Sequence, residues 1–358
     1  LRLLQEGRLI AGPWYNLPDE WLVSGEALVR NLSRGRRLCR ELGIVPMDFA
    51  YTPDQFGHIA ALPMIMKAFG LSAGICWRGT QDETHPAHFS WIGPDGGKMP
   101  YYKLIDKGSY ANFYFSVRRP LQEAGYDLTL LPALFDSFLK DEQPRTAAPV
   151  LLLLDALDHL RPDANMPAIL RELREKYPDI SFEWGNLEAF GRELARHGDS
   201  LPERKGELRI PLRDAHRPGQ YLIVHTISSR YDLKQQNDRC QNLLEKWMEP
   251  MLVFEMMRGG RPVSGFADKA WQYLLRNHPH DSICGCSVDQ VHRDMHYRFD
   301  QARLLGDGCI RRSMAQIASA SAHSGDWRHI AVHNPLPYSR REIVELALFF
   351  PEDFADNG

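Results

Sequence analysis

The loop at residues 51–58, YTPDQFGH, presents a carboxylate in a turn that its neighbours impose. Pro53 fixes the backbone before Asp54, and Gly57 permits a turn that a side chain would obstruct. A carboxylate held in this way can attack an electrophilic carbon or ligate a metal ion. The alternative is that Asp54 only caps the following helix, which is the commoner role of such an aspartate.

A second cluster, residues 277–285 (NHPHDSICG), joins two predicted helices and holds two histidines and an aspartate within four residues. Neutral imidazole and carboxylate groups suit zinc, which makes His280 and its neighbours candidate ligands. The alternative is a polar turn in which Asp281 and Ser282 cap helices. One His-x-His pair cannot by itself complete a site of four ligands.

A third cluster, residues 154–159 (LDALDH), places Asp155 and Asp158 at the end of an apolar run. A carboxyl group there loses hydration, which raises its pKa and suits it to be a general acid near neutral pH. The alternative is that one of these aspartates caps the next helix. Weaker candidates are a loop carboxylate and three tryptophans that either stack on a sugar or pack in the core: Glu207, Trp14, Trp77 and Trp271.

These clusters need elements that bring them together, and the first two hundred residues alternate predicted strands and helices. The predicted strands cover 47–51, 71–79, 149–155 and 179–185, and the predicted helices cover 25–43, 59–69, 166–177 and 186–197. This alternation predicts a parallel sheet, whose chemistry is found at the carboxyl ends of the strands. Asp54, Arg78 and Asp158 each lie at or just past the end of a predicted strand.

Near residue 230 the strands give way to three predicted helices. A long helix over 239–257 contains Pro250, which predicts a kink, and further helices cover 265–276 and a segment from 287. Three such helices indicate a small bundle. We therefore predict an α/β domain over 1–230, a three-helix bundle over 231–325, and the start of a β-sandwich domain over 326–358, where an alternating apolar run indicates a strand.

Bulk composition argues against several classes of function. The chain has 358 residues, a net charge of −3 and a hydrophobic fraction of 44%, which are ordinary values for a soluble globular protein. We expect no nucleic-acid partner, and no membrane span because no apolar run reaches ~18 residues. The six cysteines are spread out, so we expect thiols in a reducing cytoplasm. A homo-oligomer is compatible with these features.

In this combination and order, the motifs resemble those of glycoside hydrolase family 38, the α-mannosidases, and look closest to its bacterial branch. The resemblance is carried by residues 12–32, 52–63, 77–79 and 277–292, and it runs over essentially the whole chain. It implies a seven-stranded parallel α/β barrel, incomplete in this chain, followed by a three-helix bundle and large β-domains.

The resemblance also implies catalytic and metal-binding roles. Asp54 matches the nucleophile, which is also a zinc ligand, and His280 matches a second zinc ligand. Asp158 matches the general acid/base, although the family's usual pair of aspartates has no clear counterpart here. The other two zinc ligands belong to a His-x-Asp segment that we expect upstream of Leu1, in a longer protein. Whether this chain alone holds zinc or is active is left open.

Three further residues match positions that contact the substrate. Phe56 matches an aromatic residue near the metal and the sugar, Arg78 an arginine beside the nucleophile, and Asp281 a residue that bonds substrate hydroxyls. The implied activity is retaining hydrolysis of an α-mannoside or of a small mannosylglycerate-like substrate. Such a mechanism uses two carboxyl groups about 5–5.5 Å apart.

Two other classes of function stay open. A metal-dependent sugar deacetylase is one, because similar incomplete barrels host that chemistry, and it needs His and Asp ligands around an open water position. A metal-free carbohydrate-binding or inactive fragment is the other. The carboxyl pair of Asp54 and Asp158, with Arg78 beside it, favours glycoside cleavage.

Overall fold

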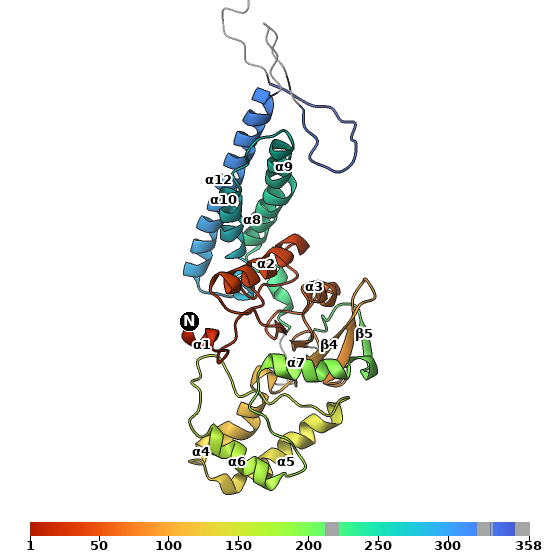
Figure 1. Ribbon diagram of the computed structural model, residues 1–358, viewed down its shortest axis with the longest axis vertical. Coiled ribbons are helices and arrows are strands. Elements are labelled where there is room, and N and C mark those ends of the chain that lie inside the picture. The colour runs from red at the N-terminus through yellow and green to blue at the C-terminus, as the bar shows by residue number, and fades with distance from the viewer. Residues whose placement is uncertain (212–221, 321–329, 331, 348–358) are drawn as a thin grey trace, which may run out of the picture.

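The computed structural model describes residues 1–211, 222–320, 330 and 332–347. Figure 1 shows an elongated molecule with long helices at one end, a sheet in the middle and a smaller group of helices at the other end. Among the described residues, no helix is both long enough and apolar enough to cross a membrane.

The middle part is a five-stranded mixed sheet between layers of helices. Its strands are β1 (Ala50–Thr52), β2 (Gly74–Cys76), β3 (His88–Ile92), β4 (Lys98–Lys103) and β5 (Glu203–Lys205). Their spatial order is β1-β2-β4-β3-β5, in which β3 and β4 form an antiparallel pair and the other neighbours are parallel. The sequence did not predict this hairpin, although its short polar turn at residues 93–97 is a recognised hairpin signal.

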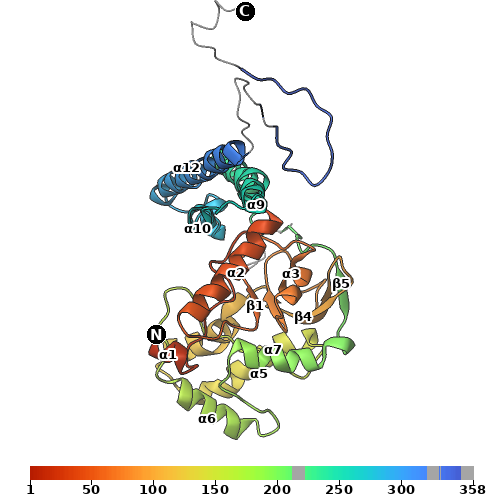
Figure 2. The same ribbon diagram turned by 45° about the horizontal axis from the view of Figure 1, so that its top comes forward.

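Successive residues of a strand point to opposite sides of the sheet, and here both sides carry apolar side chains. Helices therefore cover both faces. The helices are α2 (Gly25–Glu41) and α3 (Leu62–Ala68) on one face and α7 (Leu187–Arg196) on the other, and a short helix, α1 (Arg2–Gln5), begins the chain (Figure 2). Tyr101 packs in the core with α2 and α3, whereas the next residue, Tyr102, contacts Phe190 of α7 at 5.2 Å between ring centroids. The sheet therefore has two buried faces.

Two segments predicted as strands have no ladder partner, and those predictions are wrong. In residues 149–155 the backbone bonds a side chain instead: Asn112 accepts from Leu154 N at 2.8 Å and donates to Leu152 O at 2.9 Å. In residues 179–185, Arg174 donates to Phe182 O at 2.7 and 3.1 Å. The described residues thus show five strands in one open sheet, and the seven-stranded barrel stays a prediction.

A group of helices packs beside the sheet around its own apolar cluster. It comprises α4 (Arg119–Glu123), α5 (Leu131–Glu142) and α6 (Met166–Lys176), with a π-helical turn at Tyr114–Arg118 before α4. Phe113, Phe135, Ile169 and Leu173 are fully or almost fully buried there. Predicted helices at 25–43, 59–69, 166–177 and 186–197 are confirmed as α2, α3, α6 and α7.

The other end of the molecule consists of long helices around one core. These are α8 (Tyr231–Asn242), α9 (Glu249–Met257), α10 (Ser264–Leu275), the short α11 (His280–Ile283) and α12 (Asp289–Ala320). A π-helical segment at Leu243–Met248 joins α8 to α9 just before Pro250, which lacks the N–H that a regular helix needs. Described residues 330 and 332–347 form neither helix nor strand, so the β-domain and the domain boundaries stay predictions.

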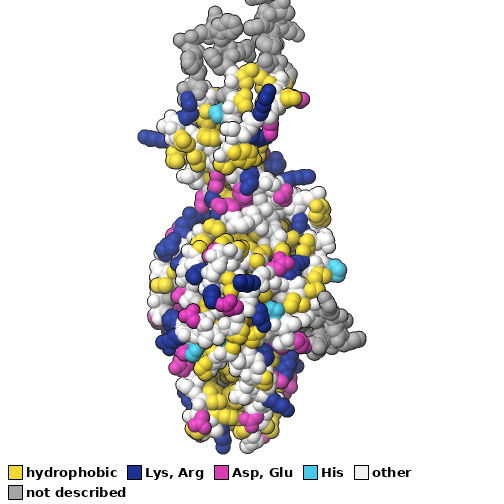
Figure 3. Space-filling view, turned by 90° about the vertical axis from the view of Figure 1, so that its right-hand side faces the viewer, with side chains coloured by type: hydrophobic (Ala, Val, Ile, Leu, Met, Phe, Trp, Pro, Cys, Tyr) yellow, Lys and Arg dark blue, Asp and Glu magenta, His cyan; other side chains and the backbone are white. Residues whose placement is uncertain are grey.

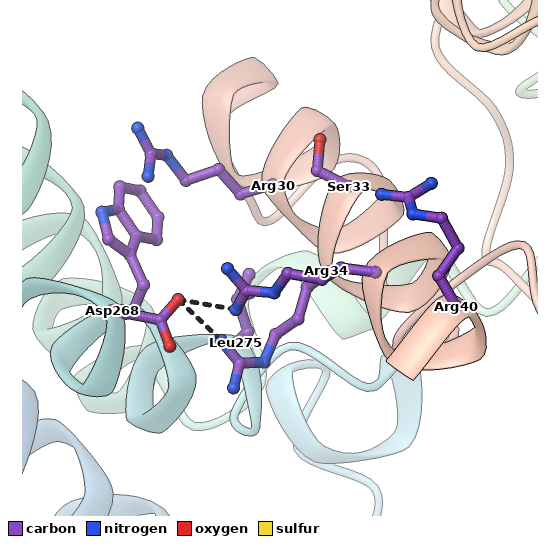
Figure 4. A pocket seen from close by; sticks show the side chains of 8 residues that line it. Arg30, Ser33, Arg34, Arg40, Asp268 and Leu275 are labelled. Atoms are coloured by element: carbon purple, nitrogen blue, oxygen red, sulfur yellow. Dashed lines mark hydrogen bonds and ion pairs between the residues drawn. The ribbon is translucent and has the colours of Figure 1, made fainter. Parts of the chain in front are cut away.

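The sheet part and the long helices meet where α2 lies beside α10. Arg34 and Arg37 of α2 both donate to Asp268 Oδ1 of α10, at 3.1 and 2.8 Å (Figure 4). The Arg30 guanidinium lies 4.5 Å from the ring centroid of Trp271, which is buried in the helical core. These side chains line a cavity of about 260 Å³. None of the predicted site residues lines this cavity, so it is not the predicted active site.

Hydrophobic side chains are also visible on the surface of the long helices (Figure 3). Four residues of α9 and α10 are examples with large exposed side chains: Val253, Met256, Met257 and Phe266. Nothing in the described residues covers them.

Candidate active site

Asp54 lies in a rigid loop two residues after β1. Gly57 has a φ of +87°, and a Cβ atom there would lie 2.9 Å from the carbonyl oxygen of Leu208. This close approach lets His58 and Leu208 exchange two backbone hydrogen bonds, of 2.8 and 3.0 Å. Glycine is required here both for its φ and for space. The loop that presents Asp54 is thereby fixed to another part of the chain.

A buried hydrogen bond between His58 and Glu20 anchors the far end of the same loop. His58 Nδ1 lies 2.8 Å from Glu20 Oε1, and both side chains are fully buried. The other Glu20 carboxylate oxygen accepts from Ile59 N at 3.0 Å. The following helix, α3, has Ala61 at its N-cap and no side-chain cap. Asp54 therefore does not cap α3, and the capping alternative is wrong.

Arg78, just after β2, contacts both the backbone and the side chain of Asp54. Its Nε donates to Asp54 O at 3.1 Å, and its Nη2 lies 3.9 Å from Asp54 Oδ1. The guanidinium also lies 4.5 Å from the Trp77 ring centroid and 5.4 Å from that of Phe56. Parallel pairing of β1 with β2 brings the two loops together at their carboxyl ends. Phe56, Arg78 and Asp54 thus form one cluster.

The charge state of Asp54 depends on opposing effects. Burial is the largest and raises the pKa of its carboxyl group, and the carboxylates of Asp158 and Asp281 raise this pKa further. His280 and Arg78 act in the opposite direction and lower it. The net direction is upward. Arg78 therefore favours the ionised form of Asp54, but burial outweighs its effect.

Asp158 is exposed, so the loss of hydration expected from its place after an apolar run is wrong for this residue. It receives a hydrogen bond from Tyr110, whose hydroxyl lies 3.1 Å from Asp158 Oδ2. Tyr110 also lies edge-on to Trp77, with 6.1 Å between ring centroids. Burial raises the pKa of Tyr110, and the charges of Asp54 and Asp158 raise it further. Both carboxylates therefore raise the pKa of the same phenol. They raise the pKa of Tyr51 as well, to about 12, where burial is again the main cause.

The loop that carries Asp158 is held by a buried arginine. Arg118 is 3% exposed and donates to Asp155 Oδ1 at 2.5 Å and to Asp163 Oδ2 at 3.0 Å. These carboxylates flank Asp158 in the sequence. The next helix, α6, has no side-chain cap, so neither Asp155 nor Asp158 caps it. Asp155 has a structural role, whereas Asp158 points toward Tyr110.

His280 begins α11, and its ring is oriented by the backbone of Leu17. His280 N donates to Leu17 O at 2.9 Å, and the ring Nδ1 lies 3.1 Å from the same oxygen. A carbonyl oxygen only accepts, so Nδ1 carries a proton in this contact and Nε2 is the ring nitrogen left for a ligand. The ring also lies edge-on to Phe56, with 5.9 Å between centroids. A histidine oriented in this way is typical of a metal ligand.

The two histidines of the 277–285 cluster have different surroundings. His278 is fully buried, and its Nε2 lies 2.7 Å from Asn237 Oδ1. Burial lowers the pKa of His278 to about 3. His278 is therefore a neutral core residue. Asp281 is exposed, with its Oδ1 3.8 Å from His280 Nε2, and α11 begins without a side-chain cap, so Asp281 does not cap it.

Asp54 and His280 have the right donors for two positions of a zinc site, since one offers a carboxylate and the other a free imidazole nitrogen. Among the described residues, no third His, Cys, Asp or Glu side chain forms a ligand set with these two. The part of the chain that the structure describes therefore offers two of the four ligands of such a site. The described residues do gather one other set of possible ligands, Asp281, Cys284 and Cys286.

Three residues near the site were not among the sequence candidates. Tyr110 and Arg118 come from a segment without a motif, and Asp19 is buried beside Glu20, with a pKa raised to about 6 mainly by burial. The weaker sequence candidates are now placed: Trp77 is in the site, Trp14 and Trp271 are in apolar cores, and Glu207 is exposed.

The class of this site follows from its carboxylates. Glycoside hydrolases use two carboxyl groups, and the candidates for such a pair are Asp54, two residues after β1, and Asp158, in a loop that follows no strand. Residues 1–205 match the Glycosyl hydrolases family 38 N-terminal domain, and residues 224–317 match the Alpha mannosidase middle domain. The chain belongs to glycosyl hydrolase family 38.

Individual relatives agree with this assignment. A putative mannosylglycerate hydrolase of Halalkalibacterium halodurans is 31% identical over 330 residues, which cover 89% of this chain and 35% of that protein. Alpha-mannosidase 2C1 of Mus musculus is 24% identical over 344 residues, covering 94% of this chain and 30% of that protein. The crystal structure of an alpha-mannosidase from Enterococcus faecalis V583 matches with a TM-score of 0.76 at 29% identity, over 89% of this chain and 35% of that one. The chain thus spans about a third of the length of these relatives.

Proposed function

We propose that this chain carries the central part of the active site of a retaining α-mannoside hydrolase, with Asp54 as nucleophile and Asp158 as general acid/base. One observation carries the proposal: the carboxylates of Asp54 and Asp158, which come from separate loops, both raise the pKa of the Tyr110 phenol. The Tyr110 hydroxyl also donates a hydrogen bond to Asp158. The substrate class is an α-mannoside or a small mannosylglycerate-like compound, as the names of the relatives indicate.

The two carboxyl groups divide the reaction between them. In the first step Asp54 forms a bond to the anomeric carbon while Asp158 gives its proton to the departing oxygen. In the second step water replaces Asp54 and gives a proton to Asp158, which restores both groups. The exposure of Asp158 suits a group that exchanges protons with water, and Arg78 favours the ionised Asp54 that the first step requires.

Other side chains position the substrate. The Asp281 carboxylate is exposed near His280 and can accept hydrogen bonds from sugar hydroxyls. Phe56 lies between Arg78 and His280 and offers an apolar surface to the sugar ring. Asp54 and His280 would hold a zinc ion, which when bound holds adjacent sugar hydroxyls and stabilises developing charge. The remaining ligands would come from outside the described residues.

Two alternatives are less well supported. A metal-dependent deacetylase needs several His and Asp ligands around an open water position, whereas we assign a metal role to one histidine and one aspartate among the described residues. A non-catalytic sugar-binding fragment does not account for a second carboxylate loop fixed by the buried Arg118. We also propose a cytoplasmic location, as the dispersed free cysteines suggest.

The test is to trap the glycosyl–enzyme intermediate in the natural protein that contains this chain. A fluorinated mannosyl fluoride slows the second step, so the sugar should stay attached to the peptide that contains Asp54, as detected by mass spectrometry. Asp54→Asn should abolish labelling, whereas Asp158→Asn should slow it less, because fluoride needs little protonation to leave. A label on any other carboxylate would remove Asp54 from the nucleophile role. Release of acetate from an acetylated sugar would favour the deacetylase.

A further inference from the structure

Two cysteines in the turn between α11 and α12 lie together with Asp281 of α11. Cys284 Sγ lies 3.3 Å from Cys286 Sγ, which in turn lies 3.2 Å from Asp281 Oδ1. Each side chain therefore has a potential ligand atom within 4.8 Å of the other two. Two sulfur atoms and one carboxylate oxygen form a donor set that suits Zn²⁺ and softer divalent cations.

The backbone builds this cluster. Gly285, between the two cysteines, has a φ of +89°, which turns the chain and brings both thiols to the same side. Ser287 closes the turn, because its backbone N–H and its hydroxyl both donate to Asp281 O, at 3.2 and 2.9 Å. The three donors are thus held by local hydrogen bonds, and the set does not depend on a long flexible loop.

The spacing of the donors is close to that of a metal site. In a tetrahedral zinc site, two ligand atoms are roughly 3.6–3.8 Å apart, given Zn–S and Zn–O distances of about 2.3 and 2.1 Å. The observed separations of 3.3 and 3.2 Å therefore need to widen by only a few tenths of an ångström. Cys286 and Asp281 are exposed, which leaves a side open for entry and for a fourth ligand such as water.

The surrounding charges are compatible with a cation. Lys234 donates to Cys284 O at 3.0 Å, and Arg230 donates to Gly285 O at 3.3 Å, so both cationic groups bond carbonyl oxygens and leave the sulfur atoms free. Burial raises the pKa of Cys284 and Cys286, which keeps both as thiols near neutral pH. Binding of a divalent cation must therefore release two thiol protons.

We propose that Asp281, Cys284 and Cys286 form a second cation site, which takes Zn²⁺ or a soft divalent cation such as Cd²⁺. The site is separate from the pair Asp54 and His280 in its ligands, although Asp281 follows His280 directly in the sequence. If the proposed function holds, a cation in this site engages the same Asp281 carboxylate that we assign to sugar hydroxyls. Excess Zn²⁺ or Cd²⁺ would then compete with the substrate.

The direct test is a Cd²⁺ titration of the reduced, metal-free protein, followed by the ultraviolet charge-transfer absorption of cadmium thiolates. We expect the absorption to saturate at one Cd²⁺ per chain. Cys286→Ser should weaken Cd²⁺ binding by at least about tenfold and remove most of the absorption. Cys286 is exposed, so this variant is expected to fold, which circular dichroism would verify. Cys309→Ser, at a buried cysteine of α12, is the matched control and should keep the absorption.

A further variant separates the new site from the proposed catalytic one. Asp54→Ala should keep the cadmium–thiolate absorption at full amplitude, since Asp54 is not a ligand of the sulfur site. The proposal is overturned if no thiolate absorption appears, if Cys286→Ser keeps it, or if Asp54→Ala removes it. None of these readouts requires activity, so a failure of the proposed hydrolase function would leave the result interpretable.

Discussion

Replacing Arg78 by methionine tests how the charge of Asp54 is controlled. The guanidinium lies 3.9 Å from the carboxylate, where two unit charges attract by about 4 kcal/mol at an effective dielectric constant of ~20. The side chains keep 15% and 23% of their surface in water, so the attraction is screened, and we expect about a third of it to remain. About 1.4 kcal/mol corresponds to one pKa unit. Without Arg78, the already raised pKa of Asp54 should therefore rise by about one further unit.

The assay is the pH dependence of kcat/KM for hydrolysis of an α-mannoside. Only ionised Asp54 attacks, so the acidic limb of the profile should move to higher pH by about one unit in Arg78→Met. Arg78→Lys keeps a positive charge and should move the limb less. Arg196→Met, at an exposed arginine of α7, is the control and should leave it in place. An unchanged limb in Arg78→Met, or a shift to lower pH, would refute the electrostatic argument.

Three other perturbations have defined outcomes. Tyr110→Phe removes the hydrogen-bond donor to Asp158 and should lower kcat/KM about tenfold on an unactivated α-mannoside. The loss should be smaller on p-nitrophenyl mannoside, whose leaving group needs little protonation. Equal losses on both substrates would contradict a role of Tyr110 in supporting Asp158 as the acid. Arg118→Met removes the cationic partner of the partly buried Asp155 and Asp163 and should lower the free energy of unfolding in urea by about 3 kcal/mol. The control Arg119→Met, at the exposed neighbouring arginine, should not change this free energy measurably. His278 stays neutral when folded down to a pH of about 3, while its unfolded form binds a proton below about pH 6.5. The free energy of unfolding should therefore fall as the pH drops through this window, by up to ~1.4 kcal/mol per pH unit from this residue. His278→Gln should flatten the slope of the free energy of unfolding against pH between pH 6 and 4. An unchanged slope would show that His278 does not titrate as inferred.

The sequence by itself determined the local elements and the order of the chemical motifs. Apolar periodicity predicted α2, α3, α6 and α7, and Pro250 predicted an irregularity that the π-helical segment before α9 shows. The combination of three loop motifs indicated the family to which the chain belongs. These features are local because hydrogen bonds within a helix and the geometry of proline and glycine depend on nearby residues.

Only the tertiary structure decided which polar residues meet and what each one bonds. Leucines 151–154 predicted a strand, but Asn112, forty residues earlier in the chain, takes the backbone hydrogen bonds that a neighbouring strand would have taken. His278 and His280 are chemically identical and two residues apart, yet one is buried against Asn237 and the other is oriented by Leu17. Likewise, the spacing of Cys284 and Cys286 indicated nothing until Gly285 was seen to turn both thiols toward Asp281. Burial and long-range partners determine the chemistry of a side chain, and neither is contained in its local sequence.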